Sequence, residues 1–244
     1  MAEHREGGRP RQLFFSPHPD DIALAAFASL LRVPPGVPRA LISVFTQSCW
    51  EFVLPVDRTR AFAVTSRRLE EDLRFARAWG ASLVHLGFRD TSLRLSPGVE
   101  DRRPSTADPL FPAVQAALRD VLENEAPDVV CHVPLGISGH VDHLMVRDSL
   151  LALRGGARGV VFYEDLPYCE QYTEEEIAAF VRALGLGLAP HLLELGAEWP
   201  AKVKAMRLYE SQLEAKTIPA IERYARRLGA GRGMAERVWK VDAR

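Results

Sequence analysis

The chain has few cysteines, no extreme of charge and no long apolar run, and each absence excludes a class of protein. Its three cysteines, Cys49, Cys131 and Cys169, are far apart and form no Cys-x-x-Cys pair, which argues against a disulfide framework or a thiolate zinc site. The 31 Lys and Arg residues nearly balance the 32 Asp and Glu residues, and the resulting net charge of −1 argues against nucleic acid as a partner. No segment approaches the ~18 consecutive apolar residues of a membrane span, and the polar opening MAEHREGGRPRQ lacks the apolar core of a signal peptide. We therefore expect a soluble, cytoplasmic protein with no membrane insertion.

What the chain does contain is an alternation of two hydrophobic patterns. Short apolar runs rich in β-branched or aromatic residues have the length of buried strands, and they occupy residues 11–16, 40–46, 81–88, 128–135 and 159–165. Apolar residues recur at helical spacing between them, in residues 21–32, 59–79, 111–124 and 141–153. Strands that alternate with helices indicate a parallel sheet covered on both faces. The sequence predicts an α/β protein, a single Rossmann-like, three-layer domain spanning residues 1–244 with a mostly parallel sheet.

Three segments lie outside this alternation. Residues 1–10 are polar and are predicted to form a disordered tail. Residues 96–112 form a long, polar, proline-rich stretch, which we interpret as a loop that faces the substrate. Residues 199–228 are predicted to be a C-terminal helical region, whose packing positions would be Met206, Tyr209, Leu213 and Ile218.

Two clusters of histidine and aspartate follow predicted strands. The first, HPDD at residues 18–21, comes directly after the first strand. The second, HVDH at residues 140–143, follows the fourth strand after a turn that contains Gly136 and Gly139. In open parallel sheets, ligands bind outside the carboxyl ends of the strands. Both clusters are therefore expected at the same edge of the sheet, where they would form the active site.

The residue types in these clusters indicate a metal centre that performs hydrolysis. Two imidazoles and one carboxylate, with one coordination position left for water, are typical of catalytic Zn²⁺, and Fe²⁺ accepts the same ligands. The clusters hold further Asp and His side chains, which hydrolysis needs as a proton acceptor and a proton donor. A structural zinc site would instead use four ligands and usually cysteine. For Asp20 or Asp21 the alternative is a helix cap, since aspartate is favoured at that position.

Through these two clusters the chain resembles the N-acetylglucosaminylphosphatidylinositol de-N-acetylase (PIG-L) family, also called LmbE-like deacetylases. The resemblance covers most of the chain and extends to RLEED at residues 68–72, LGFRD at 86–90 and YEDLPY at 163–168. It implies an enzyme, a zinc-dependent N-deacetylase that removes an N-acetyl or other N-acyl group from an amino sugar or amino-sugar conjugate. The implied partner is therefore a small-molecule amino-sugar or glycoconjugate substrate, and a homo-oligomer is possible.

The resemblance also implies roles for individual residues. The implied metal ligands are His18, Asp21 and His143. Asp20 would act as the general base on water activated by the metal. His140, oriented by Asp142, would stabilise or protonate the developing charges.

Residues outside the two clusters are candidates for substrate binding. Arg68 resembles an arginine that the family places near the substrate, although a charged helix face would explain it equally. Glu164, Asp165 and Tyr168 follow the last predicted parallel strand and should emerge at the active edge. We expect the two carboxylates to be exposed and to bind sugar hydroxyls, and the tyrosine ring to offer a stacking face. The alternative is a turn closed by Pro167.

The chain departs from the family pattern at two places. Many members continue the first motif with an acidic residue and a pair of glycines, where this chain has Ile22 and the sequence AAFA at residues 25–28. Some members carry a tyrosine shortly before the second motif, where this chain has Ile137 and Ser138. These departures leave two alternatives open: a metal-binding member whose activity has lapsed, and a hydrolase of esters or other amides.

Overall fold

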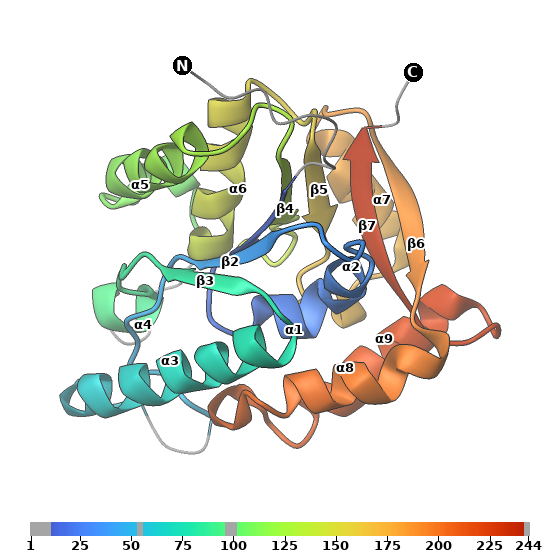
Figure 1. Cartoon of the computed structure of the whole chain (residues 1–244), viewed down its shortest axis with the longest axis horizontal. Helices are drawn as coiled ribbons and strands as arrows, with labels where there is room; N and C mark the ends of the chain where they lie inside the picture. The colour runs from blue at the N-terminus through green and yellow to red at the C-terminus, as the bar shows by residue number, and fades with distance from the viewer. Residues whose placement is uncertain (1–10, 53–55, 96–101, 242–244) are drawn as a thin grey trace.

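The computed structural model describes residues 11–52, 56–95 and 102–241, in which one seven-stranded sheet has the order β3-β2-β1-β4-β5-β7-β6 (Figure 1). The strands are β1 (Gln12–Ser16), β2 (Arg39–Ser43), β3 (Ser82–His85), β4 (Val130–Pro134), β5 (Val160–Tyr163), β6 (Leu188–Glu194) and β7 (Ala235–Val241). Strands β1 to β5 pair in parallel, whereas β7 is antiparallel to both β5 and β6. The predicted α/β class and mostly parallel sheet are confirmed. The predicted tail at residues 1–10 lies outside the described residues.

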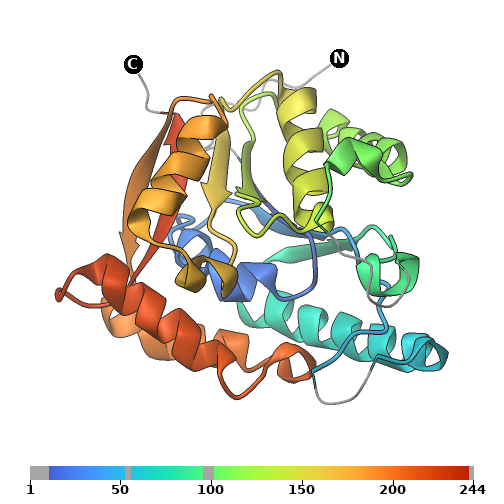
Figure 2. The ribbon, with the colours of Figure 1, turned by 180° about the vertical axis from the view of Figure 1, so that it is seen from behind.

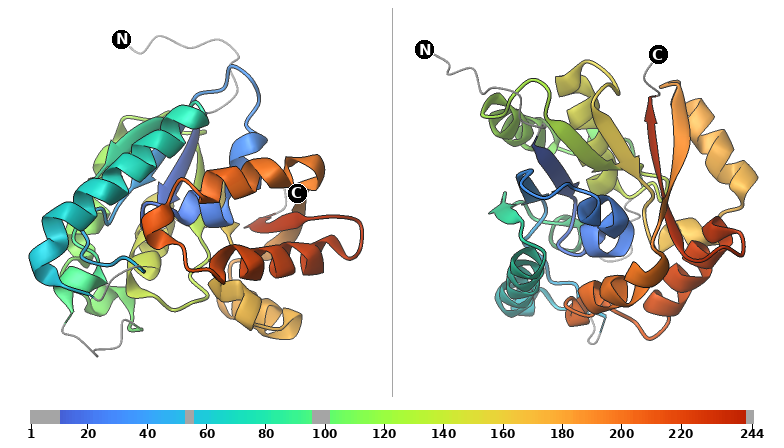
Figure 3. Two further views of the ribbon diagram at one scale, coloured as in Figure 1. Left: turned by 90° about the horizontal axis from the view of Figure 1, so that it is seen from below. Right: turned by 45° about the vertical axis from the view of Figure 1, so that its right-hand side comes forward.

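Helices cover both faces of the sheet (Figures 1 and 2). The helices are α1 (Asp21–Ala25), α2 (Phe27–Leu31), α3 (Ala61–Ala78), α4 (Thr91–Arg94), α5 (Phe111–Glu123), α6 (Val141–Arg154), α7 (Glu174–Ala183), α8 (Trp199–Met206) and α9 (Thr217–Gly229). Helices α1, α2, α3 and α8 lie on one face, and α5, α6 and α7 lie on the other (Figure 3). Strands β1 and β4 are therefore buried on both faces, which explains why their sequences are almost continuously apolar. In the described part of the chain, no helix is both long and apolar enough to cross a membrane.

The strand order creates a crevice between β1 and β4. From β1 the chain moves to β2 and β3 on one side, and it then returns to β4 and β5 on the other side. At such a switch point the connections leave neighbouring strands in opposite directions, so the carboxyl ends of those strands border an open space. Helices α1 and α6 begin at this crevice, and each begins within one of the two His/Asp clusters.

The helix predicted over residues 21–32 is broken, which corrects the prediction of a continuous element. Helix α1 ends at Ala25 and α2 begins at Phe27, because Ala26 has a φ of −128°. The break separates the carbonyl of Leu24 from the N–H of Ala28, which a continuous helix would join. Instead, Leu24 O accepts a hydrogen bond from Nζ of Lys202 at 2.6 Å, and Ala28 N donates to Glu236 at 2.8 Å. A buried Lys202–Glu236 ion pair thus replaces one helical hydrogen bond.

The C-terminal part contains more than the predicted helical region. Residues 199–228 form two helices, α8 and α9, which are separated by residues 207–216. Of the predicted packing positions, Met206 and Tyr209 are fully buried, whereas Leu213 and Ile218 are partly buried against the core. Strands β6 and β7 were not predicted. Strand β6 exposes alternate residues at the edge of the sheet, and β7 carries charged residues among its apolar ones.

Candidate active site

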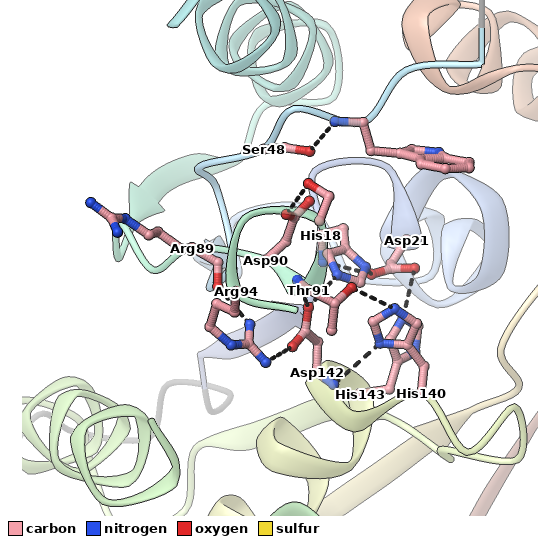
Figure 4. Close-up of polar contacts among 12 residues, drawn as sticks. His18, Asp21, Ser48, Arg89, Asp90, Thr91, Arg94, His140, Asp142 and His143 are labelled. Atoms are coloured by element: carbon pink, nitrogen blue, oxygen red, sulfur yellow. Dashed lines mark hydrogen bonds and ion pairs between the residues drawn. The ribbon is translucent and has the colours of Figure 1, made fainter. Parts of the chain in front are cut away.

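Three side chains converge at the crevice in the arrangement of a metal centre (Figure 4). His18 follows β1, Asp21 is the first residue of α1, and His143 lies in the first turn of α6. One ligand atom from each of these residues lies within 4.8 Å of the other two. Two imidazole nitrogens and one carboxylate oxygen suit Zn²⁺ or Fe²⁺ and leave coordination positions free. The structure therefore brings together the three ligands that the resemblance implied.

Each histidine in this triplet is held by a second carboxylate. Nδ1 of His143 donates to Oδ1 of Asp165 at 2.5 Å, and Nε2 of His18 donates to Oδ2 of Asp142 at 3.0 Å. The other nitrogens face Asp21: His143 Nε2 is 3.6 Å from one of its oxygens, and His18 Nδ1 is 3.7 Å from the other. Histidines that bind metals usually donate their second N–H in this way, which selects the tautomer and orients the ring. This pairing is the strongest geometric sign that a cation belongs between these residues.

The Asp165 carboxylate is itself held by the turn after β4. Its Oδ2 accepts hydrogen bonds from the backbone N–H groups of Gly136 at 2.7 Å and Ile137 at 3.0 Å. Gly136 has a φ of +76°, a conformation that favours glycine, as the sequence predicted for a tight turn. Burial alone would lower the pKa of His143, but the charges of Asp21 and Asp165 raise it to about 9. A cation must therefore displace a proton from this imidazole when it binds.

The expected exposure of Glu164 and Asp165 is wrong. Both side chains are buried, and neither lines the pocket that lies over the triplet. Asp165 orients His143, whereas Glu164 accepts hydrogen bonds from Nε of Arg237 at 2.6 Å and Nε1 of Trp239 at 2.8 Å. These partners lie on β7, which pairs with β5. Because the sequence gives no sign of that pairing, the burial of these carboxylates could not be foreseen.

Asp20 lies next to the triplet and is not part of it. Its φ of 150° is unusual for a residue with a side chain, and conformations of this kind cost about 1–3 kcal/mol and cluster at functional sites. Asp20 occupies the N-cap position of α1, yet its side chain makes no capping hydrogen bond, so helix capping does not explain it. Burial and the nearby charge of Asp21 raise the pKa of Asp20 to about 7, although Arg68 opposes the shift. A bound cation would lower this pKa again.

His140 lies beside both histidines of the triplet. Its ring centroid is 5.0 Å from that of His18 and 5.3 Å from that of His143. Nδ1 of His140 accepts a hydrogen bond from the backbone N–H of Asp142 at 3.2 Å, and Nε2 is 3.5 Å from Oγ1 of Thr91. His140 lines the pocket, so its ring can reach a bound ligand.

Asp142 is fully buried, and it lies beside both His140 and His18. One of its carboxylate oxygens lies within 4.8 Å of a ring nitrogen of His140, the residue that it was predicted to orient. The carboxylate also accepts hydrogen bonds from His18, from the Thr91 N–H at 3.2 Å and from Nη2 of Arg94 at 2.8 Å. Burial alone would raise the pKa of Asp142, but His18, His140 and Arg94 hold it well below its usual range. The residue therefore remains an anion and positions His18.

Arg94 and Asp108 were missed by the sequence reasoning. Nη2 of Arg94 also donates to Asp108 at 2.9 Å, so the arginine joins the segment after residue 101 to Asp142. Asp108 belongs to the predicted 96–112 loop, of which residues 96–101 lie outside the described part. Neither residue belongs to a recognisable sequence motif, and their contact forms only when the chain folds.

A pocket of about 1060 Å³ lies over the triplet. The centre of its lining is His18, Asp20, Asp21, Arg68, His140 and His143. Arg68 is only 3% exposed, and its guanidinium lies 3.6 Å from a carboxylate oxygen of Asp20 and 3.6 Å from one of Asp90. Tyr168, which is 40% exposed, also lines the pocket. Arg68 and Tyr168 therefore lie where a substrate could contact them.

The chain is an α/β protein with a mostly parallel sheet and a candidate metal site at the carboxyl ends of its strands, and comparison with known proteins identifies its family. Residues 13–153 match the family model described as PIG-L, GlcNAc-PI de-N-acetylase. The chain belongs to this family. It is 35% identical over 226 residues to a 2'-N-acetylparomamine deacetylase of Streptomyces fradiae, covering 90% of this chain and 79% of that protein.

Solved structures share the fold. The structure of A40926 pseudoaglycone deacetylase superposes with a TM-score of 0.70 at 22% identity, covering 97% of this chain and 100% of that one. A zinc-inhibited form of teicoplanin deacetylase superposes with a TM-score of 0.72 at 21% identity, covering 94% of this chain and 97% of that one. The identities are low, so these two likenesses concern the fold alone.

Proposed function

We propose that this protein is a metal-dependent N-deacetylase that removes an N-acetyl or other N-acyl group from an amino sugar or amino-sugar conjugate. The observation that carries the proposal is the His18, Asp21 and His143 triplet, with Asp20 beside it at the base of a large pocket. A purely structural metal site would need neither an open pocket nor a neighbouring carboxylate that does not itself bind the metal. Membership of the family and the similarity to a deacetylase of an N-acetylated aminoglycoside support the choice of reaction.

His18, Asp21 and His143 would hold a divalent cation. When bound, such a cation supplies Lewis acidity, which lowers the pKa of water toward ~7 and polarises an acyl oxygen. The donor set accepts Zn²⁺ and Fe²⁺ alike. Because a structural relative was obtained in a zinc-inhibited form, the activity of this protein needs to be measured with several metals and at several zinc concentrations.

Asp20 would accept the proton of the attacking water. Its carboxylate lines the pocket beside Asp21, so it can reach a water molecule at the centre without being needed as a ligand. Because a bound cation would lower the pKa of Asp20, the carboxylate would be deprotonated at neutral pH and able to accept a proton. Arg68, 3.6 Å from Asp20, keeps the carboxylate directed at the pocket and balances part of its charge.

His140 would complete the reaction as the acid. In its charged form, which requires Nδ1 to give up the hydrogen bond that it accepts from the Asp142 N–H, the imidazole would stabilise the oxyanion of the tetrahedral intermediate and then donate a proton to the departing amine. The carboxylate of Asp142 is an anion, so its charge attracts a cationic imidazole. The pocket is thus lined by a base, Asp20, and an acid, His140.

Two alternatives make different predictions. A member with lapsed activity would bind metal but release no acetate from any N-acetyl amino sugar. A hydrolase of esters would release acetate from O-acetylated sugars and leave the amide intact. Neither alternative requires both Asp20 and His140, whereas amide hydrolysis requires an acid as well as a base because an amine is a poor leaving group.

The test combines metal analysis with acetate release. We expect about one divalent metal per chain in the purified protein, its loss in His143→Ala, and acetate release from 2'-N-acetylparomamine or N-acetylglucosamine. The Asp20→Asn variant should retain the metal and lose roughly 10²–10⁴-fold in kcat. Metal without acetate release from any amide would contradict the deacetylase proposal, and a metal-free, fully active protein would contradict the metal centre.

A further inference from the structure

Two large aromatic side chains are held at the mouth of the pocket. Trp50 is 41% exposed and Phe52 is 42% exposed, and both line the pocket over the metal triplet. Their rings meet edge to face with centroids 5.6 Å apart. Aromatic side chains of this size are usually buried unless the exposed surface binds something.

The backbone that carries these rings is fixed by hydrogen bonds. The N–H of Trp50 donates to Oγ of Ser48 at 2.9 Å, and its carbonyl accepts from Nε2 of Gln212 at 3.2 Å. The N–H of Phe52 donates to the carbonyl of Ser211 at 3.0 Å. These bonds tie the segment to residues that lie between α8 and α9. The exposure of the two rings is therefore set by a constrained backbone.

The residue between the two aromatics adds a further constraint. Glu51 is 3% exposed, and it forms ion pairs with Arg60 and, at 3.0 Å, with Nη1 of Arg67. Burial of Glu51 directs its neighbours, Trp50 and Phe52, away from the interior and toward the pocket. The ion pairs with Arg60 and Arg67 compensate for the burial of the Glu51 carboxylate, so they hold it on the inner side of the segment.

The same segment is connected to the proposed catalytic residues. Oγ of Ser48, which accepts the Trp50 N–H, also accepts a hydrogen bond from Nη1 of Arg68 at 3.0 Å. Arg68 in turn lies 3.6 Å from Asp20. The aromatic pair is therefore held at a fixed position relative to Asp20, the proposed general base. A binding subsite for another part of the substrate requires such a fixed position.

The rest of the pocket lining suits a ring better than a charged group. Tyr168, 40% exposed, also lines the pocket. Charged side chains at the rim are paired with one another: Glu170 with Arg223 at 3.0 Å, and Glu214 with Lys216 at 2.9 Å. These pairs leave little net charge with which to attract an ion. The volume of about 1060 Å³ lies at the upper end for drug-sized ligands and far exceeds a single sugar ring.

From these observations we propose that Trp50 and Phe52 form a stacking subsite for the ring attached to the N-acetylated sugar. The apolar face of a polyhydroxylated six-membered ring would lie on the aromatic surface, and its hydroxyl groups would face the polar rim. This assignment rests on the proposed deacetylase function and narrows its substrate class to glycosides of two or more rings. The monosaccharide N-acetylglucosamine would occupy only the inner part of the pocket.

The experiment compares a two-ring and a one-ring substrate in the same variants. We would measure kcat/KM for 2'-N-acetylparomamine and for N-acetylglucosamine with Trp50→Ala and Phe52→Ala. The quantity to compare is kcat/KM for 2'-N-acetylparomamine divided by kcat/KM for N-acetylglucosamine. We expect this ratio to fall about tenfold in each variant, through KM more than kcat, because one aromatic contact is lost. Trp50→Phe should restore most of the ratio. Phe62→Ala is the matched control, because Phe62 is 85% exposed on α3 and does not line the pocket.

A binding measurement separates failure of this inference from failure of the proposed function. Calorimetric titration of 2'-N-acetylparomamine into Asp20→Asn, with and without Trp50→Ala, should show about tenfold weaker binding in the double variant. Binding to Asp20→Asn that depends on Trp50, found together with no acetate release by the wild-type protein, would support the subsite and contradict the proposed function. An unchanged ratio in Trp50→Ala, an equal loss on both substrates, or no binding of the two-ring compound would overturn the subsite.

Discussion

Nδ1 of His143 lies 2.5 Å from Oδ1 of Asp165, and this contact joins the start of α6 to the segment after β5. The carboxylate is held on its other side by two backbone N–H groups, so it has little freedom to rotate. It fixes one proton of His143 on Nδ1 and directs Nε2 toward Asp21, where a cation would displace the second proton. The candidate metal site therefore includes a buried carboxylate that belongs to neither His/Asp cluster.

Asp165→Asn is expected to weaken metal binding. The amide oxygen would accept the hydrogen bonds from Gly136 and Ile137, so the amide NH₂ would face Nδ1 of His143. The imidazole would then carry its proton on Nε2, the nitrogen that must bind the cation. Loss of a partner of this kind typically costs 10–100-fold in metal affinity, which competition with a chromogenic chelator would measure.

The control for this change is Asp148→Asn, because Asp148 pairs with Arg147 and Ser105 on the far side of α6 from the triplet. It should leave the metal affinity within about twofold of the wild-type value. An Asp165→Asn protein that binds the metal as tightly as the wild type would show that this carboxylate does not select the tautomer.

Gly136→Ala should destabilise the metal-free protein more than Gly139→Ala. Both glycines have positive φ, at +76° and +73°, which costs an L-residue about 1–2 kcal/mol. At Gly136 a methyl group would also meet Nη1 of Arg147 at 2.9 Å, and that nitrogen donates to Leu135 O. Loss of this hydrogen bond adds about 1 kcal/mol. Urea unfolding of the two variants measures the difference, and equal destabilisation would contradict the steric argument.

The buried Lys202 and Glu236 side chains should contribute to the free energy of unfolding in a strongly non-additive way. Lys202→Met would leave the Glu236 carboxylate buried without a counter-charge, and such changes cost about 3–5 kcal/mol. Burial lowers the pKa of Lys202, while the charge of Glu236 opposes the shift, so each group depends on the other. The double variant Lys202→Met/Glu236→Gln should therefore lose less stability than the two single changes added together. Additive losses in a double-mutant cycle would argue against this dependence.

His132 should make the protein less stable as the pH falls below about 6.5. Its ring is buried and stacks on Phe14 with centroids 4.1 Å apart, and burial lowers its pKa from 6.5 to about 3. Between these values the unfolded chain binds a proton that the folded chain does not, so acid favours unfolding. The contribution approaches about 1.4 kcal/mol per pH unit.

His132→Phe preserves the stacking and removes the titrating group. Urea unfolding between pH 7 and pH 4 should therefore show a smaller loss of stability in this variant than in the wild type. Identical slopes in His132→Phe and the wild type would mean that His132 is not the group responsible.

Much of the fold could be predicted because its signals are local. Runs such as residues 11–16 and 128–135 are apolar on both faces, and that pattern identifies buried parallel strands without knowledge of their neighbours. Since all parallel strands end at one edge, the order of strands and motifs was enough to place the two His/Asp clusters together. The family resemblance then named His18, Asp21 and His143 as ligands, and the structure brings their side chains together.

Contacts between distant segments account for what the sequence did not reveal. The broken helix after Ala25 is completed by Lys202, which is 178 residues from Leu24 along the chain. Glu164, which was expected at the surface, is buried because β7 pairs with β5 and brings Arg237 and Trp239 against it.

The amino-acid sequence by itself determined the α/β class and the chemistry available at the edge of the sheet, because both depend on residue types and short periodic patterns. Only the tertiary structure decided which carboxylate orients which histidine: Asp142 contacts His18, and Asp165 contacts His143. It also decided that Trp50 and Phe52 face the same pocket as the metal triplet. Hydrogen bonds and stacking require atoms within a few ångströms of one another, and packing of the whole chain alone brings such atoms together.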